Sequence, residues 1–199
     1  MIDNRICFIG DSFVAGAGDA QCLGWVGRVV QSANKAGHCI TAYNLGIRRD
    51  SSDDISARWE EEVGRRFNTD AAHYLVFSFG ANDMTFENGQ YRVNVFKSLE
   101  NFTRIIKAAK ARYPTLIMGP CPVGDAGQNA RLIELDQSYG DVAKKLGAPY
   151  ISVINTLMKY LLWVDEAKGG DGAHPSCQGY SYLASLFQNW DQWWFGDGA

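Results

Sequence analysis

The sequence lacks long hydrophobic runs, a secretory signal pattern and a surplus of charge of either sign. No apolar run approaches the roughly 20 residues that a transmembrane helix needs, so no integral membrane segment is expected. The apolar run 6–9 is too short for a signal core, although a signal removed before residue 1 would leave no trace. The formal net charge is −3. This small charge argues against nucleic acid or an anionic membrane as the main partner.

The cysteines form neither a metal-binding nor a disulfide pattern. There are five of them, an odd number, and they are scattered without any CxxC pair. None of the three histidines lies beside a pair of cysteines. We therefore expect no metal site and no disulfide framework, and reduced thiols in a cytoplasmic protein.

What the sequence does contain is a regular alternation of strand-like and helical segments. Its 199 residues, 46% of them hydrophobic, suffice for one domain over residues 1–199 with a sizeable core. Strands are expected at 5–9, 39–45, 74–79, 116–118 and 150–153. Helices are expected at 25–36, 93–113, 129–146, 155–163 and 176–194, and also up to residue 66 from a cap at Ser52 or Asp53. This order predicts an α/β fold whose five-stranded parallel sheet has helices on both faces.

Four loops are expected at the edge of this sheet where the strands end. The segments GDSFVAGAG, NLGIRRDSS and FGANDMT follow the first three strands, and GGDGAHPS precedes the last helix. In an open α/β sheet, ligands bind in the crevice outside the carboxyl ends of the strands. The four loops are therefore candidates for one shared site.

The residue types in these loops fit an acyl-transfer site. Ser12 could be the nucleophile, but a serine alcohol is weak and needs an adjacent base. His174 could take and return its proton, and Asp171 could hold the imidazole in the required tautomer. The backbone N–H groups of Ser12 and Gly46 and the side-chain amide of Asn82 could stabilise the developing oxyanion.

Each of these residues also has a simpler interpretation. Gly46 could supply a positive φ in a turn, and Asn82 could form an Asx turn. Asp171 could belong to a turn, and His174 could merely lead into a helix. A phosphate-binding loop at 10–18 is a rival, but it lacks the Gly-Lys-Ser/Thr ending and the full dinucleotide fingerprint. The joint occurrence on four loops favours the acyl-transfer site.

The four blocks together resemble the SGNH hydrolases, also called GDSL-type esterases and lipases. The matching blocks, in chain order, are Gly10-Asp11-Ser12 with Gly16 and Gly18, Gly46 of Asn44-Leu45-Gly46, Gly80-Ala81-Asn82-Asp83, and Asp171-Gly172-Ala173-His174-Pro175. The resemblance implies a flavodoxin-like, three-layer α/β/α sandwich. It implies a Ser12, His174 and Asp171 triad, an oxyanion hole from Ser12, Gly46 and Asn82, and no metal or organic cofactor. The implied function is hydrolysis of a small-molecule carboxylic ester through an acyl-enzyme.

Two departures from the family pattern bear on the substrate. Phe13 stands where the family name has leucine, and Arg48 and Arg49 follow Gly46 where many members carry small or polar residues. The two arginines are expected to be solvated, to pair with Asp50, Asp53 or Asp54, or to bind an anionic group of the substrate. Phe13, Arg48, Arg49 and Met84 are the candidate substrate contacts, within the loops 13–25, 84–91, 123–128 and 163–170.

The loops contain no long apolar lid, which favours an esterase for short acyl chains over an interfacial lipase. Two alternatives stay open: a non-catalytic carbohydrate- or ligand-binding module on the same fold, and a lysophospholipase or thioesterase of the same family. The aromatic C-terminus is predicted to continue the last helix and pack against the sheet, with Phe195 and the residues after it exposed. The oligomeric state is not indicated.

Overall fold

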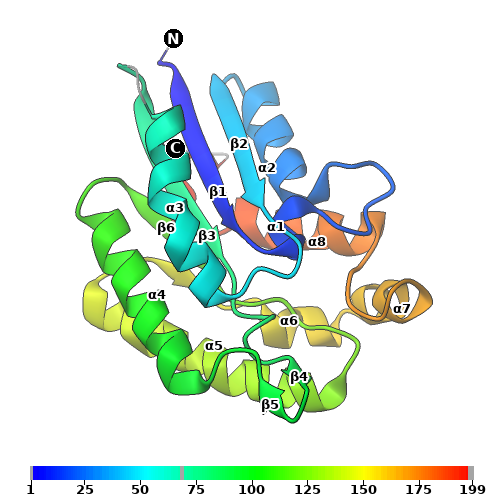
Figure 1. Ribbon diagram of the computed structural model, residues 1–199. Helices are drawn as coiled ribbons and strands as arrows, with labels where there is room; N and C mark the ends of the chain where they lie inside the picture. Colours follow the sequence, from blue (N-terminus) through cyan, green and yellow to red (C-terminus); the bar gives the residue numbers. More distant parts are fainter. Residues whose placement is uncertain (1, 68–69, 197–199) are drawn as a thin grey trace.

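The computed structural model, which describes residues 2–67 and 70–196, contains a five-stranded parallel sheet between two layers of helices (Figure 1). The strand order is β2-β1-β3-β6-β7, and every neighbouring pair is parallel. The strands are β1 (Asn4–Gly10), β2 (Ile40–Gly46), β3 (Ala72–Ser78), β6 (Thr115–Met118) and β7 (Tyr150–Ile151). The predicted α/β sandwich is confirmed.

The central strands β1 and β3 are apolar and buried because helices cover both of their faces. Successive side chains of β1 enter opposite layers: Ile6 and Phe8 join one core cluster, and Cys7 and Ile9 join the other. Gly10 pairs with the last residues of β2 and β3, so the three strands end level with one another. The loops that follow them therefore leave from the same edge.

The helices divide into two layers by the cluster that they complete. The first cluster includes buried residues of α2 (Gly24–Lys35), α7 (Leu161–Gly169) and α8 (Cys177–Gln188). The second includes residues of α3 (Ser52–Arg66), α4 (Val95–Lys110) and α5 (Ala126–Leu146). In Figure 1, α3 and α4 lie in front of the sheet, and α2 and α8 lie behind it. Within the described parts of the chain, no helix is both long and apolar enough to cross a membrane.

Several element boundaries differ from the sequence prediction. The cap of α3 is Ser51, one residue before the predicted candidates, and it forms a capping box with Asp54. The single helix predicted at 155–163 is two helices, α6 (Ile154–Lys159) and α7, separated by extended Tyr160. The break redirects the chain so that Trp163 and Ala167 are buried.

Two small elements near the carboxyl edge were not predicted. The four-residue helix α1 (Ser12–Ala15) begins directly after β1. The hairpin of β4 (Phe86–Glu87) and β5 (Gln90–Tyr91) lies within the segment predicted as a polar loop. Its turn residues Asn88 and Gly89 both have positive φ, of 53° and 79°. Such Asn-Gly turns match the twist of two antiparallel strands.

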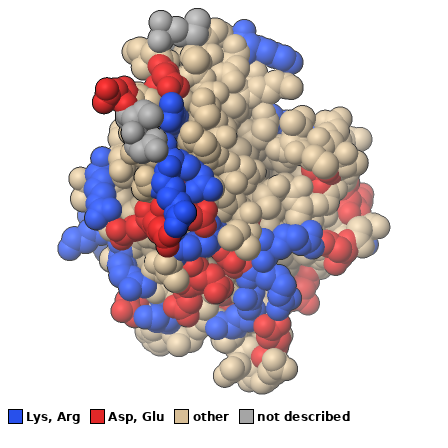
Figure 2. Space-filling model, turned by 45° about the horizontal axis from the view of Figure 1, so that its top comes forward, with Lys and Arg blue, Asp and Glu red and all other residues tan. Residues whose placement is uncertain are grey.

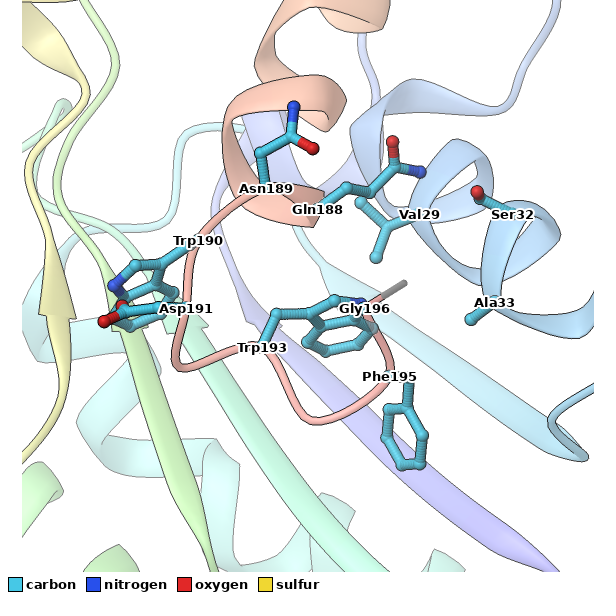
Figure 3. A pocket seen from close by; sticks show the side chains of 10 residues that line it. All are labelled: Val29, Ser32, Ala33, Gln188, Asn189, Trp190, Asp191, Trp193, Phe195 and Gly196. Atoms are coloured by element: carbon cyan, nitrogen blue, oxygen red, sulfur yellow. The ribbon is translucent and has the colours of Figure 1, made fainter. Parts of the chain in front are cut away.

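The aromatic C-terminus corrects two further predictions. Helix α8 ends at Gln188, so the residues up to Trp194 do not continue it. Figure 3 shows the following loop with Trp193 turned towards α2 and Trp190 turned the other way, around a cavity of about 440 Å³. Phe195 is buried, at 8% exposure, because it packs against Tyr74 and His38. The prediction for residues 197–199 lies outside the described residues.

Candidate active site

Ser12 lies immediately beyond the carboxyl end of β1. Asp11 caps α1, because its side chain accepts a hydrogen bond from the N–H of Phe13 (3.0 Å). Gly16 ends the same helix in the left-handed conformation, with φ of 77°. Ser12 is thus the first residue of a single helical turn that is fixed at both ends.

A continuous chain of hydrogen bonds connects Ser12, His174 and Asp171. Ser12 Oγ lies 2.7 Å from His174 Nε2, and His174 Nδ1 lies 2.7 Å from Asp171 Oδ2. The other carboxylate oxygen of Asp171 accepts the backbone N–H groups of Ala173 (3.1 Å) and His174 (2.9 Å). The structure thus brings together three side chains that the sequence separates by up to 162 positions.

The electrostatics of Asp171 determine the tautomer of His174. Partial burial alone would raise the pKa of Asp171, but hydrogen bonds from the His174 backbone and ring, and from Ala173, hold it well below its usual value. An ionised Asp171 accepts a hydrogen bond from Nδ1–H and so keeps the proton of His174 on Nδ1. Nε2 is then left unprotonated and can accept the hydroxyl proton of Ser12.

The loop after α1 packs against the segment that carries His174. A Cβ at Gly18, where φ is 87°, would lie 2.7 Å from the carbonyl oxygen of Pro175 and 3.0 Å from His174 Cβ. On the other side, the ring of Phe13 lies 5.0 Å from the His174 ring. These two contacts restrict where the imidazole can move.

A buried ionic cluster ties the same loop to α8. The carboxylate of Asp19, 6% exposed, accepts the backbone N–H groups of Gln21, Leu23 and Gly24. It also accepts hydrogen bonds from Arg28 of α2 and Cys177 of α8. Although burial acts in the opposite direction, these bonds lower the pKa of Asp19. Sequence reasoning missed this cluster, because no spacing rule connects Asp19 with Cys177.

The three predicted oxyanion donors differ in their surroundings. The N–H of Ser12 belongs to the first turn of α1, where no intrahelical acceptor exists. Asn82 Nδ2 donates to the carbonyl oxygen of Asp50 (2.9 Å), which leaves its second N–H for a ligand. The N–H of Gly46 instead donates to Asn44 Oδ1 (3.0 Å). The amide of Gly46 is therefore available only if this hydrogen bond is shared or broken.

Gly46 has a clear steric role. A Cβ at this position would lie 2.1 Å from the backbone nitrogen of Ala15 and 2.7 Å from the carbonyl oxygen of Asp11. The end of β2 can therefore approach the turn that carries Ser12 only if residue 46 is glycine.

A cavity of about 370 Å³ opens at the hydrogen-bonded chain. The lining residues are Ser12, Phe13, Arg48, Arg49, Ala81, Asn82, Thr85, Val123, Asp125, Gln128, Asp171, Gly172, Ala173 and His174. Gly46 and Met84 are not among them. Met84 is 1% exposed and packs in the core cluster beneath α3 and α4, so its predicted place at the substrate is corrected.

Arg48 and Arg49 line the cavity, but their partners differ from those predicted. Arg48 Nη2 lies 3.4 Å from Asp171 Oδ2, and Arg49 Nη2 lies 3.0 Å from Glu87 of the hairpin. The three predicted acidic partners instead bind other groups: Asp50 binds Arg58, Asp53 binds Asn101, and Asp54 binds Ser51. Both arginine side chains are largely exposed, at 61% and 69%. In Figure 2, acidic and basic side chains lie next to one another on the left and lower parts of the face, and most of the upper right carries neither.

Asp83 anchors the loop that carries Asn82. Its buried carboxylate accepts the N–H of Ser52 at the start of α3 (2.8 Å) and the hydroxyl of Ser98 in α4. Burial raises the pKa of Asp83.

Across residues 2–67 and 70–196, no three His, Cys, Asp or Glu side chains are grouped so that they could hold a metal ion.

Comparisons with known proteins agree with this architecture. The model of the GDSL-like Lipase/Acylhydrolase family matches residues 8–182. No curated protein gives a significant match. A lipase/acylhydrolase from Enterococcus faecalis is 26% identical, with 92% of each chain covered and a TM-score of 0.76. An acetylxylan esterase from Geobacillus stearothermophilus shares the fold at 19% identity, with 98% of this chain and 97% of that chain covered and a TM-score of 0.77.

Proposed function

Because the chain belongs to the GDSL-like lipase/acylhydrolase family and is a carboxylic ester hydrolase, we propose that it cleaves short-acyl esters through an acyl-enzyme on Ser12. The observation that carries this proposal is the pair of 2.7 Å contacts that link Ser12 to His174 and His174 to Asp171. These distances lie within the range over which a base can take the proton of a nucleophile.

In the first half of the reaction, His174 Nε2 takes the proton of Ser12 as Oγ forms a bond to the ester carbonyl carbon. The carbonyl electron pair moves to its oxygen and gives a tetrahedral oxyanion. When this intermediate collapses, the bond to the alcohol oxygen breaks, and His174 donates its proton to the departing alkoxide. Asp171 stays ionised and stabilises the imidazolium.

The second half releases the acid. A water molecule gives a proton to His174 Nε2 as its oxygen attacks the acyl carbon. The new tetrahedral intermediate then expels Ser12 Oγ, which takes the proton back from His174. The products are a carboxylic acid and the free enzyme.

Both oxyanions need hydrogen-bond donors, and each donor typically contributes a factor of about 100 to 1000 in rate. We assign this role to the Ser12 N–H and to the second N–H of the Asn82 amide. The N–H of Gly46 would serve only after Asn44 Oδ1 releases or shares it. The main role of Gly46 is therefore to let the end of β2 pack closely against α1.

The residues of the cavity wall suit an ester substrate with a small acyl group and a polar alcohol. Its apolar side chains are mostly small, namely Ala81, Val123 and Ala173, together with the ring of Phe13. The remaining wall is polar or charged, which suits an alcohol rich in hydroxyl groups. The acetylxylan esterase that shares the fold is named for a substrate of this kind. Arg48 and Arg49 would contact the alcohol, or an anionic group on it.

The decisive test uses a fluorophosphonate probe and hydrolysis of p-nitrophenyl acetate. The wild type should be labelled and active, and Ser12→Ala should lose both properties. Ser138→Ala, which removes a hydroxyl on α5 away from the cavity, is the matched control. Labelling that persists in Ser12→Ala would exclude Ser12 as the nucleophile.

A panel of esters then tests the substrate class. We expect kcat/KM to fall as the acyl chain lengthens from acetyl to octanoyl. A preference for long acyl chains, thioesters or lysophospholipids would instead favour the other members of the family. A wild type that binds a sugar without any hydrolysis would point to a binding module.

A further inference from the structure

Helix α8, which follows directly after His174, is capped by a residue of another helix. Ser176 at its N-cap position makes no capping hydrogen bond with its own side chain. Instead, Glu166 of α7 accepts the N–H groups of Ser176 (2.9 Å) and Gly179 (2.8 Å) through Oε2, and that of Gln178 (3.1 Å) through Oε1. A carboxylate at a helix N-terminus satisfies free N–H groups and interacts favourably with the helix dipole.

The sequence of α8 leaves space for this carboxylate. A Cβ at residue 179 would lie 2.9 Å from Glu166 Oε2 and 2.5 Å from Pro175 Cβ. Glycine, which is unfavourable inside helices, is therefore required for Glu166 and Pro175 to approach. Three N–H donors and a glycine thus hold a single acidic side chain in place.

Helix α7, which carries Glu166, also contacts the surroundings of the nucleophile. Trp163 of α7 stacks on Phe13, the residue after Ser12, with ring centroids 6.0 Å apart and an interplanar angle of 20°. Its indole N–H donates to the carbonyl oxygen of Pro122 (3.2 Å). Helix α7 therefore touches the turn of Ser12 through Trp163 and the helix after His174 through Glu166.

We propose that Glu166 is a positioning residue, which sets the place of His174 relative to Ser12 by anchoring the start of α8. This inference rests on the proposed function. Only Pro175 separates His174 from the anchored N–H of Ser176, and the fixed φ of proline makes that connection stiff. Glu166 does not line the cavity, so it acts through His174 and not on the substrate.

The expected effect is on turnover and not on binding. A displacement of about 1 Å between reacting groups can cost roughly 100-fold in rate. Glu166→Ala should therefore lower kcat by about 10- to 100-fold and leave KM nearly unchanged. Glu166→Gln keeps one acceptor oxygen, so it should retain an intermediate kcat.

Two further variants separate positioning from a general loss of stability. Asp165→Ala removes the neighbouring exposed carboxylate on the same helix and is the matched control, with kcat expected at the wild-type value. Gly179→Ala keeps Glu166 but places a methyl group 2.9 Å from its Oε2 and 2.5 Å from Pro175 Cβ, so it should displace both and lower kcat as Glu166→Ala does. Rates are expressed per site that the fluorophosphonate probe titrates, which removes the contribution of unfolded molecules.

A second readout does not depend on turnover. The proton on His174 Nδ1, hydrogen-bonded to Asp171, should give a low-field NMR signal in the wild type and in Asp165→Ala. That signal should broaden or shift in Glu166→Ala and Gly179→Ala. A wild-type kcat per titrated site together with an unchanged signal in both variants would overturn the proposal, and so would an effect on KM alone. If Ser12→Ala remained active, the proposed function would fail. The NMR comparison would still show whether Glu166 determines the position of His174.

Discussion

Replacement of Asp11 by asparagine should change how the stability of the protein depends on pH. The carboxyl group of Asp11 is 2% exposed, beneath the turn that carries Ser12. Burial is the main cause that raises the pKa of Asp11 from 3.8 to about 7. The negative charges of Asp83 and Asp50 raise this pKa further, and the hydrogen bond from the Phe13 N–H lowers it. The folded state therefore holds this proton more tightly than the unfolded state does.

The sign and size of the effect follow from this difference. Below about pH 4 Asp11 is protonated in both states, and its contribution to the free energy of unfolding is fully present. As the pH rises from about 4 to about 7 that contribution is lost, because the unfolded state ionises Asp11 freely while the folded state still holds the proton. About three pKa units at 1.36 kcal/mol each give a loss of roughly 4 kcal/mol. Asp11→Asn cannot ionise and keeps the capping oxygen, so it should avoid the loss.

The assay is urea unfolding of both proteins between pH 4 and pH 8. Asp11→Asn and wild type should have similar unfolding free energies at pH 4, and the variant should be more stable by up to about 4 kcal/mol at pH 8. Asp141→Asn, which removes an exposed carboxylate of α5, is the control and should follow the wild-type curve. Parallel curves for Asp11→Asn and wild type would refute the reasoning.

Four other substitutions test separate parts of the structure. Asp19→Ala should cost about 3–5 kcal/mol in urea unfolding, because Arg28 is left largely buried without its partner; a loss below 1 kcal/mol would contradict this. Gly46→Ala should destabilise by at least about 1–3 kcal/mol and lower activity, whereas Gly64→Ala, which meets no atom within 4 Å in α3, should stabilise by about 0.5–1 kcal/mol. Arg48→Gln should change stability by less than about 1 kcal/mol, while raising KM for anionic esters more than for neutral ones; equal changes in KM would exclude a substrate contact.

The sheet was predictable from the sequence because local signals and the final packing agree. The apolar runs of β1 and β3 suit central strands covered on both faces, and the structure places them there. The break at Tyr160 and the end of α8 at Gln188 could not be predicted, because no proline or glycine marks either position. Burial of Trp163 and Trp193 by distant parts of the chain accounts for both.

The candidate site was predictable for a related reason. Ser12, Asn82 and His174 lie in segments that were expected as loops, and the positions of these segments follow from the ends of the strands and the start of α8. The ends of the strands do not determine in which direction a side chain points. Met84 turns into the core, and Arg48 reaches Asp171, 123 positions away. Glu166 carried no sequence signal, because its role depends on the angle between two helices.

The chain order of the proposed triad has a consequence for protein synthesis. Ser12 is synthesised before strands β2, β3, β6 and β7, whereas Asp171 and His174 follow only after all five strands of the sheet. A nascent chain whose residues 171–174 have not yet left the ribosome therefore exposes the serine without its base, and it should neither react with a fluorophosphonate nor hydrolyse an ester. Esterase activity should appear only when α8 has emerged and docked. The separation of Ser12 from His174 along the chain thus couples the onset of activity to completion of the sheet.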